Sequence, residues 1–145
     1  MIKINKWRAI RHLKSSITKD TSIPDIYVTS NMNANGTYQW YTNKKYYKKN
    51  IIIIRANNTG NIFSSILTHE LCHHRQHMSG RLKKNIYQPS DWTKNYWDKI
   101  IKYFMLNINE YEALLTEYKY YKTETSKEWI SKLKEYAASN GRTLK

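Results

Sequence analysis

The sequence predicts an α+β fold in which a short region of β-strands is followed by a series of helices. β-Branched and aromatic residues gather before residue 56, and Ile51 to Arg55 begins with four consecutive isoleucines. Beyond residue 60, apolar residues recur at the three- and four-residue steps of amphipathic helices. The length of 145 residues suits one compact core, so we expect residues 1–145 to form a single domain.

The first part of the chain is expected to contain one helix and a small, mostly antiparallel sheet. Residues 2–16 place Ile4, Trp7 and Ile10 at helical spacing, which predicts an N-terminal helix with a basic outer face. Strands are predicted at residues 26–29, 36–41 and 51–55, and Asn35-Gly36 is a turn signal before the second of them.

The rest of the chain is predicted to be helical. Asn61 is expected to cap a helix that ends at Ser79-Gly80. Ser90 or Asp91 would cap a second helix, and a break near residues 106–109 would precede a third, from 110 to about 122. A possible capping box, Thr125 with Glu128, starts a last helix that stops at Asn140-Gly141.

One motif in the first of these helices has the spacing of a metal site. Thr68-His69-Glu70-Leu71-Cys72-His73 holds two histidines four residues apart, with a glutamate directly after the first. Residues four apart project from the same face of a helix, so both imidazoles can reach one cation. Glu70 is turned about 100° from His69 and can contact a metal-bound water without taking a ligand position. This H-E-x-x-H pattern is typical of zinc peptidases.

The order of the predicted elements resembles that of the zincin metallopeptidases. In both, a helix and a small sheet precede the H-E-x-x-H helix, further helices follow it, and Asn50 to His73 is similar to the family's strand and active-site helix. The resemblance spans about half of the chain. It implies a zincin-like fold with a catalytic Zn²⁺ held in part by His69 and His73, and Glu70 as the general base.

A catalytic zinc ion needs a third protein ligand. Metzincins place a glycine and a histidine seven and ten residues after the first histidine, but this chain has Gln76 and Ser79 there, which excludes that class. Gluzincins use a glutamate from a later helix, and Asn109-Glu110-Tyr111-Glu112-Ala113 resembles their E-x-x-A segment. The resemblance implies Glu110 as the ligand. Glu112 is the alternative, since some gluzincins carry the ligand directly before an alanine. The two side chains would point about 200° apart on a helix, so only one can face the metal.

Three other residues in or beside the motif are expected to lie outside the metal shell. His74 points about 100° away from His73, and His77 lies about two turns, or roughly 12 Å, along the helix from His69. Both are expected on the surface or behind the ligands. We expect Cys72 to be a small buried residue and neither a ligand nor a nucleophile.

Two supporting roles stay open at this point. Many gluzincin-like families orient a zinc-bound histidine with an acidic residue four positions after the glutamate ligand. That position is Leu114 here, so Glu117 or a backbone carbonyl is a candidate acceptor. The group that would stabilise an oxyanion cannot be chosen among thirteen tyrosines, of which Tyr87, Tyr96 and Tyr103 lie nearest in sequence.

Charge and composition limit the partners and the location. The chain carries 25 Lys and Arg against 11 Asp and Glu, a formal charge of +14, which favours nucleic acid or another polyanion as a partner but also simply increases solubility. A single cysteine excludes an internal disulfide, and no apolar run approaches the ~18 residues that cross a bilayer. The basic N-terminal stretch lacks the apolar core of a signal peptide. We therefore expect a cytoplasmic or virion-associated protein without a membrane span.

Together these observations predict a zinc-dependent metallopeptidase that acts on a protein or peptide substrate. The alternative is a basic protein associated with nucleic acid, in which Lys44-Lys45-Tyr46-Tyr47-Lys48-Lys49 binds phosphates and stacks on bases. That segment could equally be a strand edge protected by lysines. The alternative has two forms. One is similar to the SprT-like proteases, which cut DNA-bound proteins with a third histidine as ligand, and the other is a binder whose metal is structural or lost.

Overall fold

The computed structural model describes residues 1–14, 23–40 and 50–141. Within these residues the strands are β1 (Ile2–Ile4), β2 (Asp25–Thr29), β3 (Gly36–Gln39) and β4 (Ile51–Arg55). The helices are α1 (Lys6–Arg11), α2 (Gly60–Met78), α3 (Tyr96–Leu106), α4 (Ile108–Tyr121) and α5 (Glu124–Ser139). This order confirms the α+β class, with the sheet first and most of the helices after it. No helix in these ranges combines the length and the apolar character that crossing a membrane requires.

The strands form one mixed sheet in the order β1-β2-β4-β3. Strands β1 and β2 are antiparallel, β2 and β4 are parallel, and β4 and β3 are antiparallel. Strand β4 therefore has a neighbour on each side, and Ile52, Ile53 and Ile54 are all buried. A strand buried on both faces is expected to be continuously apolar, which explains the run of isoleucines.

The start of the chain differs from the prediction of one helix over residues 2–16. Residues Ile2 to Ile4 instead form strand β1, which pairs with Ile26 to Val28 of β2. Helix α1 begins only after Asn5, whose side chain accepts a hydrogen bond from the backbone N–H of Arg8. Ile4 has the spacing of a helical residue, but the hydrogen bonds to a strand more than twenty residues away decide its conformation.

The start of α3 also differs from the prediction. The helix predicted to start after Ser90 or Asp91 begins only at Tyr96, because Asp91 accepts hydrogen bonds from the backbone and hydroxyl of Thr93 and closes a local turn there. Residue 41 of the predicted second strand and the segment Lys44 to Lys49 lie outside the described residues.

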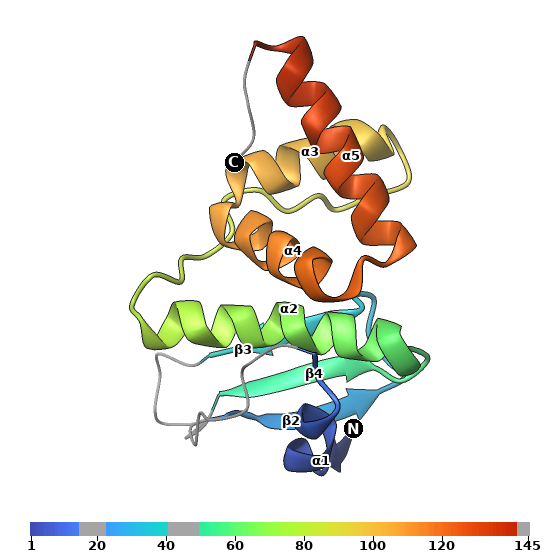
Figure 1. The fold of residues 1–145 in the computed structure, drawn as a ribbon, viewed down its shortest axis with the longest axis vertical. Coiled ribbons are helices and arrows are strands. Elements are labelled where there is room, and N and C mark those ends of the chain that lie inside the picture. The colour runs from blue at the N-terminus through green and yellow to red at the C-terminus, as the bar shows by residue number, and fades with distance from the viewer. Residues whose placement is uncertain (15–22, 41–49, 142–145) are drawn as a thin grey trace.

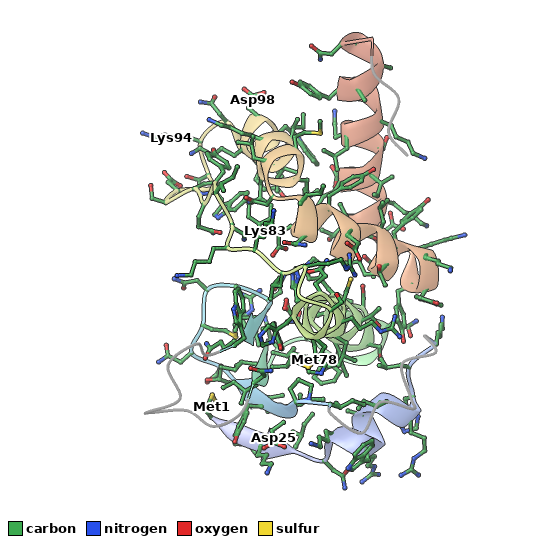
Figure 2. All side chains as sticks on the ribbon, turned by 90° about the vertical axis from the view of Figure 1, so that its left-hand side faces the viewer. Met1, Asp25, Met78, Lys83, Lys94 and Asp98 are labelled. Atoms are coloured by element: carbon green, nitrogen blue, oxygen red, sulfur yellow. The ribbon has the colours of Figure 1, made fainter. Side chains whose placement is uncertain are left out.

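Helix α2 lies between the sheet and the other large helices (Figure 1). One side of α2 packs on β3 and β4, where Leu67 and Leu71 join the isoleucines of the sheet in a first core. A second core lies among α3, α4 and α5 around Phe104, Leu114 and Leu133. Figure 2, which looks along α2 from the side of Met78, shows side chains filling the space between α2 and the helices above it. The boundary between the two cores is the contact between α2 and α4.

Candidate metal centre

The two histidines of the H-E-x-x-H motif project from the side of α2 that faces α4. Leu67 and Leu71 are directed into the sheet core, so the helical period turns His69 and His73 towards the opposite helix. Helix α4 presents Glu110 from its first turn. The two helices thus bring together His69, His73 and Glu110, whose candidate ligand atoms all lie within 4.8 Å of one another.

The carboxylate of Glu110 contacts both imidazoles through their Nε2 atoms. His69 Nε2 lies 3.0 Å from Oε2 of Glu110, and His73 Nε2 lies 3.0 Å from Oε1. The first contact has hydrogen-bond geometry, whereas His73 Nε2 has no hydrogen-bond partner among the described residues although it is buried. One candidate ligand atom from each of His69, His73 and Glu110 therefore lies near a common point.

The Nδ1 atom of each imidazole, on the ring edge away from Glu110, hydrogen-bonds to another side chain. His69 Nδ1 lies 2.9 Å from Oε1 of Glu117, whose other oxygen accepts a hydrogen bond from Ser65 Oγ at 2.8 Å. His73 Nδ1 lies 2.7 Å from Oε1 of Gln76. A carboxylate and an amide oxygen only accept, so both Nδ1 atoms donate and both Nε2 atoms are available for a metal.

These residues fit a divalent metal ion, and their chemistry suits zinc. Ligand atoms at ~2.0–2.2 Å on the corners of a tetrahedron lie roughly 3.3 Å apart, close to the 3.0 Å between each Nε2 and the Glu110 oxygens. Two neutral imidazoles and one carboxylate form a donor set that catalytic zinc sites use. The orphaned Nε2 of His73 also gains a partner when a metal binds.

The electrostatics of the metal-free site reflect the same geometry. Burial alone would lower the pKa of both histidines, but the nearby carboxylates, Glu110 first among them, together outweigh it, so the pKa of His73 is raised and that of His69 is raised well above its usual value. Burial alone would raise the pKa of Glu110, yet the two histidines hold it well below its usual range. Without metal, protonated imidazoles and a carboxylate form a compact ion-paired cluster.

Glu70 lies beside this cluster without a strong partner of its own. Its side chain is buried, and Oε2 makes no hydrogen bond within the described residues. Burial raises the pKa of its carboxyl above the usual value. Strand β3 approaches closely here, because a Cβ atom on Gly36 would lie 3.3 Å from Cγ of Glu70 and 2.5 Å from Cγ2 of Ile66. A larger residue at position 36 would therefore clash with Ile66 and crowd Glu70.

Tyr103 from α3 lies close enough to the cluster to interact with Glu110. Burial raises the pKa of its phenol, and the nearby charge of Glu110 and the hydrogen bond with it raise the pKa further. The hydroxyl also accepts a hydrogen bond from Nδ2 of Asn85 at 3.3 Å. The sequence could not select this residue, because its proximity depends on how α3 packs against α4.

The two glutamates that the sequence left open lie in different surroundings. Glu110 faces the histidines, whereas Glu112 forms an ion pair with Arg81 at 2.9 Å, where both side chains are about half exposed. The expected separation of the two side chains on one helix is thus observed. Of the two candidate acceptors, Glu117 contacts His69, so α4 supplies an acidic partner about two turns after Glu110.

The remaining histidines and the cysteine lie outside the cluster. His74 is buried, and its Nδ1 lies 3.0 Å from the hydroxyl of Tyr38, which is also 2.9 Å from Nδ1 of His77. Cys72 is buried, with its sulfur 3.7 Å from the hydroxyl of Thr116. This arrangement agrees with the expectation that they lie outside the candidate ligand set, although His74 is buried against Tyr38 and does not lie on the surface.

The sequence analysis did not identify the polar residues that connect α2 to the start of α4. Nε2 of Gln76 donates to the backbone carbonyl of Asn109 at 3.0 Å, so the residue that holds His73 also holds the start of α4. The side chains of Asn107 and Asn109 accept hydrogen bonds from the backbone of Lys83, Ile86 and Tyr87. Gln76 stands three residues after His73, and that spacing was the only signal available.

Comparisons with known proteins give no identification: no family model, curated protein or solved structure matches the chain. Any assignment of function therefore rests on the geometry of the site.

Proposed function

We propose that this chain is a zinc-dependent metallopeptidase with a zincin-like site. His69, His73 and Glu110 would hold the metal, and Glu70 would act as general base. The observation that carries the proposal is the convergence of two Nε2 atoms on one carboxylate, with both Nδ1 atoms donating to acceptors behind them. Such a support is what metal-ligating histidines need for a fixed tautomer and orientation.

When bound, a zinc ion supplies a Lewis acid that polarises the scissile carbonyl and lowers the pKa of a coordinated water to about 7. Glu70 accepts a proton from the attacking water and returns it to the leaving nitrogen. Its raised pKa and its unpaired Oε2 favour this role, because a carboxylate already engaged in an ion pair would be a poorer base. The hydroxyl of Tyr103, close to Glu110, is the candidate donor to the developing oxyanion.

The number of ligands favours catalysis over a purely structural role for the metal. Structural zinc sites are closed by four protein ligands, and catalytic sites leave one position for water or substrate. Among the described residues, the cluster consists of three candidate ligands, and the buried carboxylate of Glu70 lies next to them. A buried carboxylate without a hydrogen-bond partner costs stability, and a purely structural metal site would not require one there.

Zinc content and peptide cleavage, measured on the parent and on Glu70→Gln, test the proposal. The parent is incubated with a mixture of peptides covering many sequences, and products are detected by mass spectrometry. We expect Glu70→Gln to keep the zinc and to lose about 10²–10⁴-fold in cleavage rate, the usual contribution of a general base. Glu128→Gln on the exposed side of α5 is the matched control and should cleave at the parent rate. Equal rates for the parent and Glu70→Gln would refute the mechanism.

A further inference from the structure

The positive charge of the chain is least balanced in its first eighty residues. Residues 1–80 contain twelve Lys and Arg but three Asp and Glu, whereas residues 81–145 contain thirteen and eight. Of those three acids, Glu70 is buried beside the metal ligands. Asp25, labelled near the foot of Figure 2, pairs with Lys3 at 3.4 Å and with Lys6 at 3.3 Å. The other cations that the structure describes in this region are Arg8, Arg11, Lys14, Arg55 and Arg75, and none of them forms an ion pair with a described carboxylate.

Helix α1 displays several of these cations together with an aromatic ring. Arg8, Arg11 and His12 are exposed, and among the described residues none of them lies within ion-pair distance of a carboxylate. Trp7 is 49% exposed, although tryptophan is usually well buried. Residues three and four apart are neighbours on a helix, so Trp7 and Arg8 flank Arg11, and Arg8 flanks His12. These four residues are called the α1 face below.

A cavity of about 600 Å³ adjoins the α1 face where α1 meets the beginning of α2. Arg8 and His12 line one side of it, and Asn61, Phe63 and Ser64 of α2 line the other. The lining thus combines a guanidinium, an imidazole, amide groups and a hydroxyl with the apolar side chains of Ile4, Ala9 and Phe63. Its volume lies within the range of ~300–1,000 Å³ in which small-molecule groups such as a nucleoside are bound.

We propose that the α1 face and the adjoining cavity bind single-stranded nucleic acid. Arg8 and Arg11 contact phosphates, Trp7 stacks on one base, and a neighbouring nucleoside enters the cavity between α1 and α2. Cations beside an exposed aromatic ring are the combination by which proteins hold single strands without regard to sequence. This binding is independent of the proposed peptidase activity, because the α1 face contains none of the candidate metal ligands.

Two other polyanionic partners fit these features less well. Double-stranded DNA hides its bases from Trp7, and α1, with six residues and a length of about 9 Å, is too short to follow a groove. An anionic membrane would accept the exposed tryptophan and the arginines, but a flat lipid surface would leave the cavity between α1 and α2 unfilled. Only an unpaired strand can use the cations, the ring and the cavity together.

Fluorescence anisotropy of a labelled oligothymidylate of about 20 nucleotides, titrated with the full chain over a range of salt concentrations, tests the proposal. The test variant is Arg8→Ala/Arg11→Ala. The control is Lys94→Ala/Lys134→Ala, which removes the same charge from exposed positions of the helical part of the chain. Losing two phosphate contacts should lower the slope of log affinity against log salt by about 1.4, since each contact to a single strand contributes about 0.7.

We expect the control pair to keep the parent slope, and Arg8→Lys/Arg11→Lys to retain most of it. Trp7→Ala should weaken binding about fivefold or more, the effect of losing one stacked base. Affinities should be the same with zinc and with a chelator. Equal losses in the two alanine pairs would overturn the proposal, because they would show a diffuse effect of net charge. So would failure of the parent to bind the oligonucleotide, whether or not it sediments with phosphatidylserine vesicles.

Discussion

The assignment of Glu110, and not Glu112, as the third ligand gives a prediction about stability that does not depend on any substrate. Glu110→Ala removes the carboxylate that both Nε2 atoms contact at 3.0 Å, whereas Glu112→Ala removes only a half-exposed ion pair with Arg81. A metal that binds the folded chain alone stabilises it in proportion to the logarithm of its affinity. The two variants should therefore differ in how much zinc stabilises them.

The size of the difference follows from the loss of affinity. Mutation of residues that merely support metal ligands costs ~10–100-fold in affinity, so loss of a ligand itself should cost at least about 100-fold. At saturating zinc, a 100-fold loss corresponds to about 2.7 kcal/mol less stabilisation. For a chain of this length, each kcal/mol shifts the melting temperature by about 2–4 °C, so Glu110→Ala should lose about 5–10 °C of the zinc-dependent increase.

Thermal unfolding in zinc and in a chelator, followed by circular dichroism, measures this quantity directly. Glu112→Ala should keep the full zinc-dependent increase, and its metal-free stability should fall by no more than about 1 kcal/mol, the usual contribution of an exposed ion pair. If Glu112→Ala lost the zinc response and Glu110→Ala kept it, the ligand assignment would be wrong. If neither variant changed a clear zinc response, the metal would bind elsewhere.

Three further predictions concern the surroundings of the ligands. Glu117→Gln should lower zinc affinity about 10–100-fold by weakening the support of His69, and an unchanged affinity in a competition titration would show that this contact is dispensable. Gly36→Ala should cost about 1–3 kcal/mol through overpacking and should slow cleavage by displacing Glu70 while zinc stays bound; parent activity in that variant would refute the close approach. The raised pKa values of the two histidines stabilise the metal-free chain below their unfolded values, and this stability is lost as pH rises through the folded values. Zinc requires the neutral imidazoles, so its effect on melting temperature should be larger at about pH 8 than at about pH 5.5, and the opposite trend would contradict the ligand set.

The helical part of the site could be predicted from the sequence because its geometry is local. The spacing of His69 and His73 fixes their common direction, and the same helical period requires Glu110 and Glu112 to diverge. The period could not say which glutamate faces α2, since that depends on the packing of two helices far apart in sequence. A resemblance to gluzincins favoured Glu110, and the structure brings that residue to the histidines.

The parts that escaped prediction depend on contacts between distant residues. Strand β1 is three residues long and exists because it pairs with β2, so no periodicity within residues 2–4 reveals it. The parallel pairing of β2 with β4 requires the chain to cross over the sheet, and a pattern of alternating residues carries no sign of strand direction. The bridge from Gln76 to the carbonyl of Asn109 likewise joins α2 to the beginning of α4.

The hydrogen bonds from Asn107 and Asn109 to the backbone of residues 83–87 have a consequence for how this site can diversify. Because two asparagine side chains fix the main chain of that segment, the side chains of Lys83, Lys84 and Ile86 are exposed and carry none of this support. The segment also contacts Tyr103 through Asn85, and so it borders the candidate metal cluster. Under the proposed peptidase function, we expect substitutions at its exposed positions to alter which substrates are accepted while the same two asparagines keep the start of α4 in place. We therefore expect substrate selectivity and metal affinity to depend on different atoms of one short stretch, so that each can change without loss of the other.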